Sequence, residues 1–347
     1  MRCHRNRGTL IFVVIASLIS CKEADENAAG ADSTASAELS ATATTGATAT
    51  TSDGDEGSGS ETDPAPSKPP EEAPEEASAS PEPSAKDPPK KADPSRLSLE
   101  GEAIQGGLLT AKVEPGTRGI KFPGHRVVIA DDGTFLIAFS RNAPPKEVLT
   151  ITFPDGAVLE HEFSVAQRSF EDDRIDGLPE SFVKLPPATQ KKLRADNARI
   201  DQKRMGYTKT AHYAEGFIWP CVGKITSRYG QKRFLNGIDS GFHWGVDVAV
   251  PVGTPVKAPA GGTVIFAEAG IPLAGTMVVI DHGHGLSSSL LHLATITAKV
   301  GQEVARGDVV GTVGMTGRTN GPHLDWRMNF FEIRIDPELL APPMPGG

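Results

Sequence analysis

The chain has 347 residues, 38% of them apolar, and a formal net charge of −9 at pH 7. This length is sufficient for two ordinary domains, although apolar residues are scarce in the first third of the chain after residue 21. Because the chain is acidic and its sequence contains no basic stripe, the composition argues against a nucleic-acid partner.

Residues 1–20 are predicted to be a signal peptide, since a basic start precedes a short apolar run, residues 9–20. The segment 18–21, LISC, resembles the lipobox of bacterial lipoproteins. That resemblance implies cleavage before Cys21, lipidation of Cys21 and attachment to a membrane through this lipid anchor. Lys22, the next residue, implies the outer membrane, with the protein facing the periplasm. A plain signal peptide with a chance cysteine is the alternative.

Three segments with different compositions follow. Residues 21–96 are rich in Ala, Ser, Thr, Glu and Pro, and they are predicted to form a disordered tether because they offer little apolar surface to bury. Residues 97–169 contain short β-type runs separated by DDG and PDG turns, which predict a small β-sandwich-like domain. Residues 170–210 contain a Pro-Pro pair followed by a charged stretch, which predicts a helical connecting arm.

Residues 211–347 alternate short Val and Ile runs with glycine turns, which predicts a compact antiparallel β domain. The fold class expected for the chain is therefore mainly β. Within this domain His243 and Asp247 are separated by three residues that offer no competing metal ligand. An imidazole nitrogen and a carboxylate oxygen are ligands that Zn²⁺ binds at about 2.0 to 2.2 Å. The pair is a candidate for two ligands of a metal site.

Further ligands must come from other parts of the chain, and the candidates are His292, His323 and Asp325. In a β-strand, residues i and i+2 point to the same side of the sheet. If this segment is a strand, His323 and Asp325 face the same pocket. The expected site is a pocket in which these side chains meet His243 and Asp247.

The series of motifs between residues 217 and 338 resembles the lysostaphin-type (LytM-like) zinc metalloendopeptidases, which cut peptidoglycan peptides. The segments that carry the resemblance are GKITSRYG, HWGVDVAVPVGTPVKAPAGGTV, IDHGHG, SLLHL, VGQEVARGDVVGTVG and TGRTNGPHL. The resemblance implies a LytM-like peptidase domain that binds one Zn²⁺ ion. It also implies that the protein hydrolyses peptide cross-links or stem peptides of peptidoglycan during cell-wall remodelling.

Position by position, the resemblance makes His243 and Asp247 metal ligands and makes His292 and His323 catalytic residues beside the metal. The family's usual third ligand is a histidine, and in this chain that position is Asp325. If the family's histidine binds the ion through Nδ1, Asp325 can reach the ion as well, because an Asp oxygen lies as many bonds from Cβ as Nδ1 does. Two carboxylate ligands make the site formally neutral. This is expected to raise the pKa of metal-bound water, or to favour another divalent ion that prefers oxygen ligands.

Four further residues are candidate substrate contacts. Trp244 and Trp326 flank the proposed metal ligands, and Arg318 and Asn320 lie in the TGRTNGP loop. An arginine in such a loop can bind a carboxylate through paired hydrogen bonds. The alternative is structural: the loop residues only make the loop rigid, and the tryptophans belong to the core.

Two functions remain open on the sequence alone. The first is a metal-dependent endopeptidase of peptidoglycan, which the four histidine and aspartate matches to the family favour. The second is a degenerate LytM-like domain that binds the cell wall or activates another wall hydrolase, which Asp325 favours. A biotinyl or lipoyl carrier is disfavoured because no lysine lies in a suitable hairpin turn. A protein regulator is a further candidate partner.

Overall fold

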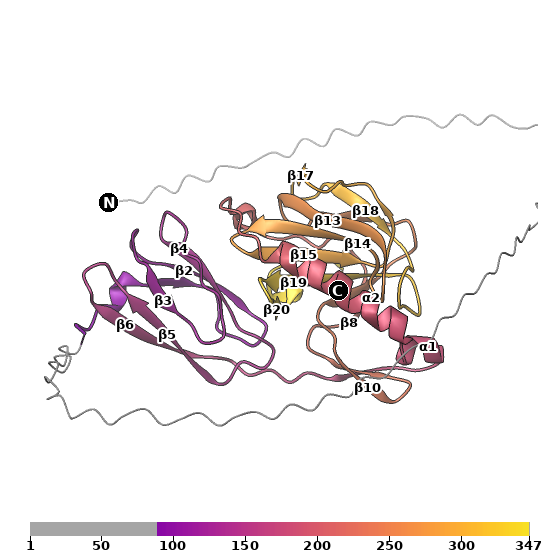
Figure 1. Ribbon diagram of the computed structural model, residues 1–347, viewed down its shortest axis with the longest axis horizontal. Coiled ribbons are helices and arrows are strands. Elements are labelled where there is room, and N and C mark those ends of the chain that lie inside the picture. Colours follow the sequence, from indigo (N-terminus) through magenta and orange to yellow (C-terminus); the bar gives the residue numbers. More distant parts are fainter. Residues whose placement is uncertain (1–88, 347) are drawn as a thin grey trace, which may run out of the picture. The chain divides into compact units, whose positions relative to one another are not determined.

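The computed structural model describes residues 89–346 (Figure 1). The predicted signal peptide, Cys21 and the predicted tether up to residue 88 lie outside the described residues. Strands greatly outnumber helices in the described part, and the predicted mainly β fold is confirmed. Between residues 89 and 346, no helix combines the length and the apolar character that crossing a membrane requires.

The N-terminal domain is a small β-sandwich of two antiparallel sheets, with strand orders β1-β2-β4 and β3-β5-β6. Side chains from both sheets fill a common core, because alternate residues of β2, β4, β5 and β6 point inward. Phe135 and Ile137 of one sheet and Leu149 and Ile151 of the other are completely buried there. The strands are β1 (Ser98–Glu100), β2 (Leu108–Lys112), β3 (Gly119–Lys121), β4 (Thr134–Ala138), β5 (Lys146–Thr152) and β6 (Val158–Ser164).

Residues before 97, the predicted start of this domain, also pair with it. Lys91 pairs in parallel with Val158 of β6, and the Ala92 amide donates a hydrogen bond to the Val158 carbonyl at 2.8 Å. Ala92 is also buried in the sandwich core. Composition did not predict this boundary, because backbone hydrogen bonds to an edge strand do not depend on which side chains the added segment carries.

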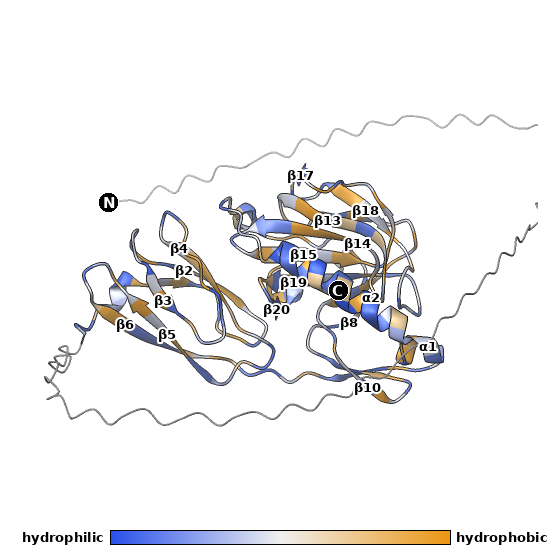
Figure 2. Cartoon of the chain, in the orientation of Figure 1, coloured by the Kyte–Doolittle hydropathy of each residue, from blue (hydrophilic) through white to orange (hydrophobic). Residues whose placement is uncertain are grey.

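The connecting segment contains a strand in addition to helices. β7 (Asp172–Ile175) pairs in parallel with β9 (Lys232–Leu235), and α1 (Glu180–Val183) and α2 (Pro187–Arg204) follow it. Pro187 begins α2, since a proline at this position lacks an N–H that the first turn would leave unpaired. α2 is largely hydrophilic in Figure 2, but its Ile200 is buried against the C-terminal domain. β7 was not predicted from the sequence.

The C-terminal domain is built on a large sheet with the strand path β17-β13-β14-β15-β19-β11-β8, and β20 pairs with β19. Two smaller sheets have the orders β12-β18-β16 and β10-β9-β7. The strands are β8 (Lys224–Ser227), β10 (Ile238–Phe242), β11 (Val246–Ala249), β12 (Pro255–Lys257), β13 (Gly262–Ile271), β14 (Gly275–Gly283), β15 (Leu286–Leu291), β16 (Leu293–Ile296), β17 (Glu303–Val304), β18 (Val309–Val313), β19 (His323–Phe330) and β20 (Ile333–Ile335).

The two faces of the large sheet have different surroundings. Val278 of β14 belongs to the main core, which includes residues of β12, β16 and β18, whereas Val279 belongs to the cluster around Ile200 of α2. Leu291, in this second cluster, pairs in register with Asp325 of β19. Since paired residues point to the same side of a sheet, Asp325 lies on the α2 side. This face is apolar under α2 and polar along β19.

Trp326 lies on the opposite face of β19 from Asp325. It is completely buried in the main core, with its ring centroid 5.5 Å from that of Trp219. The prediction that Trp326 contacts substrate is therefore wrong. Trp326 is adjacent to Asp325 in the sequence, but adjacent residues of a strand point to opposite faces. Trp244, the other tryptophan predicted to contact substrate, is only partly buried.

Trp326→Ala is expected to lower the free energy of unfolding by about 3 to 5 kcal/mol, because it removes a large aromatic side chain from a packed core. Trp244→Ala is the matched control and is expected to cost less, since Trp244 keeps part of its surface in water. Chemical denaturation of the two variants, followed by circular dichroism, measures the difference. Equal losses of stability would contradict the different environments of the two side chains.

Candidate metal centre

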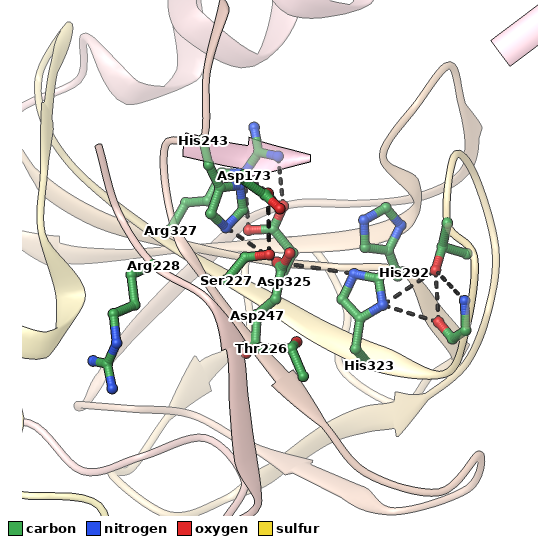
Figure 3. A network of polar contacts seen from close by, with 12 residues as sticks. Asp173, Thr226, Ser227, Arg228, His243, Asp247, His292, His323, Asp325 and Arg327 are labelled. Carbon is green, nitrogen blue, oxygen red and sulfur yellow. Dashed lines mark hydrogen bonds and ion pairs between the residues drawn. The ribbon is translucent and has the colours of Figure 1, made fainter. Parts of the chain in front are cut away.

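Two carboxylates face each other at the centre of the site. β11 and β19 pair in an antiparallel register that places Asp247 directly opposite Asp325. The two residues are buried, with exposed fractions of 6% and 1%. Like charges in directly opposite positions of neighbouring strands repel each other. This pair therefore requires positive charge nearby, and Figure 3 shows the side chains that surround it.

His243 reaches the carboxylates from the segment between β10 and β11. Its Nε2 atom lies 3.2 Å from Asp247 Oδ1, and its side chain has no exposed surface. Gly245, between the two donors, is needed for close packing. A Cβ at this position would lie 2.5 Å from the Trp326 carbonyl oxygen and 2.6 Å from Asp325 Oδ1. The HWGVD segment thus supplies two donors together with the residue type that allows β19 to approach.

The donors of His243, Asp247 and Asp325 converge closely enough to fit a metal ion, since one ligand atom from each lies within 4.8 Å of the others. In the part of the chain that the structure describes, His243 Nε2 and Asp247 Oδ1 are buried atoms that lack a hydrogen-bond partner. Two ligands of a tetrahedral zinc ion lie about 3.4 Å apart. The separation of these two atoms, 3.2 Å, is close to that value. The donor set therefore fits a divalent cation.

Two arginines compensate the opposed carboxylates. Arg233 donates through Nη2 to Asp247 Oδ2 at 3.1 Å and through Nε to Asp173 of β7 at 2.8 Å. Arg327, on the same face of β19 as Asp325, donates through Nε to both oxygens of Asp325, at 2.9 and 3.0 Å. Burial alone would raise the pKa of Asp325, but Arg327 holds this pKa below its ordinary value. Asp325 is therefore ionised at neutral pH.

His292 and His323 lie next to each other beside the three donors, with ring centroids 4.8 Å apart (Figure 3). Nδ1 of His292 lies 2.8 Å from the Thr316 carbonyl oxygen, and Nδ1 of His323 lies 2.9 Å from the Gly321 carbonyl oxygen. Because a carbonyl oxygen only accepts, each Nδ1 carries a proton, and each Nε2 keeps a free lone pair in the neutral ring. Nε2 of His323 lies 3.8 Å from Asp247 Oδ1.

The environment of His292 differs from that of an ordinary strand residue. Burial lowers its pKa to about 4, so that its ring is neutral at pH 7. Its backbone has a φ of 64°, in the left-handed region that residues other than glycine rarely adopt. Such strained backbone conformations often occur at functional sites, where the surrounding structure holds them in place.

A cavity of about 240 Å³ adjoins these residues and is lined by Asp247, His292 and His323 among others. Arg318 and Asn320, two of the predicted substrate contacts, also line it. Trp244 lines a neighbouring cavity that contains His243 and His292. Three of the four predicted substrate contacts therefore lie around the donors, and Trp326 does not.

Sequence reasoning missed three charged residues of this site, Asp173, Arg233 and Arg327. The i, i+2 rule that places His323 and Asp325 on the same side of a strand also applies to Arg327, so this residue could have been found. Asp173 and Arg233 reach the site because β7 and β9 pair in parallel. No motif in the sequence indicates that pairing.

Comparison with known proteins shows that residues 241–337 match Peptidase family M23. The chain contains an M23 peptidase domain of the LytM type. Over 86 residues the chain is 44% identical to the peptidoglycan DD-endopeptidase ShyA of Vibrio cholerae, a match that covers 25% of this chain and 20% of ShyA. Over 132 residues it is 33% identical to the cell division protein DipM of Caulobacter vibrioides. This match covers 36% of this chain and 21% of DipM. The chain thus spans about a fifth of the length of these two relatives.

The similarity to a solved structure extends beyond the M23 domain. A crystal structure from Pseudomonas aeruginosa, described as a peptidase M23, is 27% identical to this chain with a TM-score of 0.52. The match covers 69% of this chain and 95% of that chain. Regions of this chain outside residues 241–337 therefore also share the fold of the Pseudomonas aeruginosa structure.

The hydrogen bonds at His292 and His323 predict the tautomers of both rings in the M23 domain. In chelator-treated protein near pH 8, Nδ1 of each ring is expected to carry the proton and Nε2 to be unprotonated. Long-range ¹H–¹⁵N spectroscopy of histidine-labelled protein measures this, with His292→Gln and His323→Gln to assign the signals. A neutral ring with its proton on Nε2 would contradict the hydrogen bond from Nδ1 to the carbonyl oxygen.

Proposed function

We propose that the protein is a metal-dependent endopeptidase that hydrolyses peptide cross-links or stem peptides of peptidoglycan. The convergence of His243, Asp247 and Asp325, with the free Nε2 atoms of His292 and His323 beside them, carries this proposal. The match to a peptidase family supports hydrolysis of a peptide bond. The similarity to ShyA, a peptidoglycan DD-endopeptidase, supports peptidoglycan as the substrate.

One Zn²⁺ ion is the proposed cofactor, and another divalent ion that accepts oxygen ligands is the alternative. When bound, such an ion polarises the peptide carbonyl and lowers the pKa of a bound water. His243 would hold the ion through Nε2, Asp247 through Oδ1 and Asp325 through a carboxylate oxygen. Arg233 would keep the Asp247 carboxylate oriented through its hydrogen bond to Oδ2, and Arg327 would do the same for Asp325.

His292 and His323 are the proposed proton carriers. In hydrolysis, a water oxygen bonds to the carbonyl carbon and loses a proton, and the C–N bond breaks as its nitrogen gains a proton. The free Nε2 of one imidazole can take the first proton and later deliver it to the leaving nitrogen. His292, which is neutral at pH 7, fits the role of the acceptor. His323, when protonated on Nε2, can donate a hydrogen bond to the negative oxygen that forms on the substrate. The carbonyl contacts of both Nδ1 atoms fix the ring orientations needed for this work.

Arg327 changes the consequence of having an aspartate as the third ligand. A lone carboxylate would add a negative charge that an imidazole does not carry, and it would make bound water less acidic. Arg327 hydrogen-bonds both oxygens of Asp325, so this pair of residues is neutral overall, as an imidazole is. The rise in the pKa of bound water that Asp325 alone would cause is therefore expected to be largely offset.

A non-catalytic domain that binds the cell wall, or activates another wall hydrolase, is the second candidate. It is favoured by the arginine contacts, because Arg233 and Arg327 already compensate Asp247 and Asp325 without a cation. Binding alone, however, does not require two histidines with free Nε2 atoms beside the carboxylates. This difference makes the endopeptidase the preferred function.

We also propose that the protein is exported and anchored in the outer membrane through lipid on Cys21, facing the periplasm. The resemblance of residues 18–21 to a lipobox supports this location. So does 32% identity over 132 residues to the lipoprotein NlpD/LppB homolog of Pseudomonas aeruginosa. Arg318, Asn320 and Trp244 are the proposed substrate contacts, since they line the cavities around the donors.

Purified protein is expected to bind about one divalent ion per chain, as a site with three protein ligands does. Asp325→Asn is expected to weaken metal binding at least tenfold, because an amide oxygen replaces a charged ligand. Asp325→His should retain the metal. Elemental analysis and competition with a chelator measure both effects, and Asp172→Asn, an exposed residue of β7, is the control. If the metal content of the wild type stays at the background level after metal is added, His243, Asp247 and Asp325 are not the ligands of a metal ion.

Digestion of purified cell-wall sacculi tests the catalytic roles. His292→Ala and His323→Ala are each expected to lower the release of soluble peptides by at least a hundredfold while metal content stays near the wild-type level. His161→Ala, a partly buried histidine in the β-sandwich, is the matched control and should release peptides normally. A metal-loaded wild type that binds sacculi without releasing peptides would support the second candidate instead.

A further inference from the structure

A second cavity lies beside the metal centre on the same face of the large sheet. Its volume is about 380 Å³, and His243 and His292 form part of its wall. Leu193 and Asn197 of α2 line another part of the wall. The cavity therefore connects the proposed reaction site with the surface under the helix.

Four arginines from different parts of the chain line this cavity. They are Arg233 of β9, Arg318 of the loop before β19, Arg327 of β19 and Arg334 of β20. None of the residues that line the cavity is an aspartate or a glutamate. Since Arg233 and Arg327 pair with carboxylates outside the cavity, its positive charge comes mainly from Arg318 and Arg334.

Two of the four arginines lack an acidic partner. Arg233 and Arg327 pair with carboxylates that lie outside the cavity wall. Arg318 donates to the Phe182 carbonyl at 3.2 Å, and Arg334 donates to Asn329 Oδ1 at 3.2 Å. Neither makes a salt bridge with any residue between 89 and 346. Most of their N–H donors thus remain available to a ligand.

The positions of Arg318 and Arg334 are electrostatically unfavourable in the absence of a ligand. Burial is the main cause that lowers the pKa of Arg318 to about 10, and the nearby charges of Arg233 and Arg327 add to it. Burial is the main cause that lowers the pKa of Arg334 to about 9, and the nearby Arg204 and Arg327 add to it, while Asp201 and Asp325 partly oppose the shift. Both shifts mean that the charged form lacks solvation and is repelled by its neighbours. An anion in the cavity would relieve both effects.

We infer that this cavity binds a carboxylate group of a cell-wall stem peptide, held by Arg318 and Arg334 next to the reaction site. The inference rests on the proposed function for the identity of the peptide. Guanidinium groups bind carboxylates through paired, charge-assisted hydrogen bonds. Trp244, Leu193 and Pro272 line the same cavity and provide apolar surface for the carbon chain that carries the carboxylate. A peptide therefore fits this lining better than a free inorganic anion does.

The experiment measures equilibrium binding of two stem tetrapeptides to the full-length protein by calorimetry, with chelator present so that no hydrolysis occurs. One peptide has free carboxylates and the other has all of them amidated. The free peptide is expected to bind at least tenfold more tightly to the wild type, since charge-assisted hydrogen bonds are lost on amidation. Arg334→Gln should remove this difference, and Arg318→Gln provides a second variant if the first does not fold.

Arg194→Gln is the matched control, because Arg194 is an exposed residue of α2 that does not line the cavity. It should leave the preference for the free peptide unchanged. Arg334→Gln should also leave the melting temperature of the unliganded protein unchanged or raise it, whereas a purely structural arginine would lower it on removal. Equal binding of the two peptides to the wild type would overturn the inference, and so would tighter binding of inorganic phosphate than of the free peptide. Because binding is measured without metal, a failure of hydrolysis would not affect this result.

Discussion

The opposed carboxylates of Asp247 and Asp325 are the constraint on which the site depends. The register of β11 and β19 holds them directly opposite each other and away from water, where repulsion between charges is poorly screened. His243, Arg233 and Arg327 reach the pair from three different elements. The fold thus concentrates negative charge at one point and surrounds it with groups that compensate this charge. A divalent cation would complete the same arrangement.

The large sheet gives this site its geometry. One face of the sheet packs into the main core, and the other is covered by α2 and carries polar side chains along β19. This second face brings together two regions of opposite charge. One is the carboxylate pair that fits a cation, and the other is the arginine-lined cavity that fits an anion. His243 and His292 line the cavity and also lie beside the carboxylates, so a ligand held by the arginines would lie next to the reacting groups.

Much of the fold and part of the site could be predicted from the sequence. Alternating apolar runs between glycine turns predicted the mainly β fold, and the two-residue period of a strand placed His323 and Asp325 on the same side. By the same two-residue period, Trp326 points to the opposite face from Asp325 and is buried in the core. Its position next to Asp325 in the sequence had wrongly suggested a substrate contact. The contribution of Asp173 and Arg233 depends on the parallel pairing of β7 with β9. Long-range pairing of this kind leaves no local pattern in a single sequence, because its partners are far apart in the chain.

The most direct test of the central claim is a crystal structure of the protein grown with excess Zn²⁺, with anomalous diffraction data collected at the zinc edge. The expected result is one anomalous peak about 2.0 to 2.2 Å from His243 Nε2, Asp247 Oδ1 and one oxygen of Asp325. Arg327 should remain hydrogen-bonded to Asp325 in that structure. If crystals saturated with Zn²⁺ show no anomalous peak between these three side chains, the claim that the carboxylate pair binds a metal is contradicted.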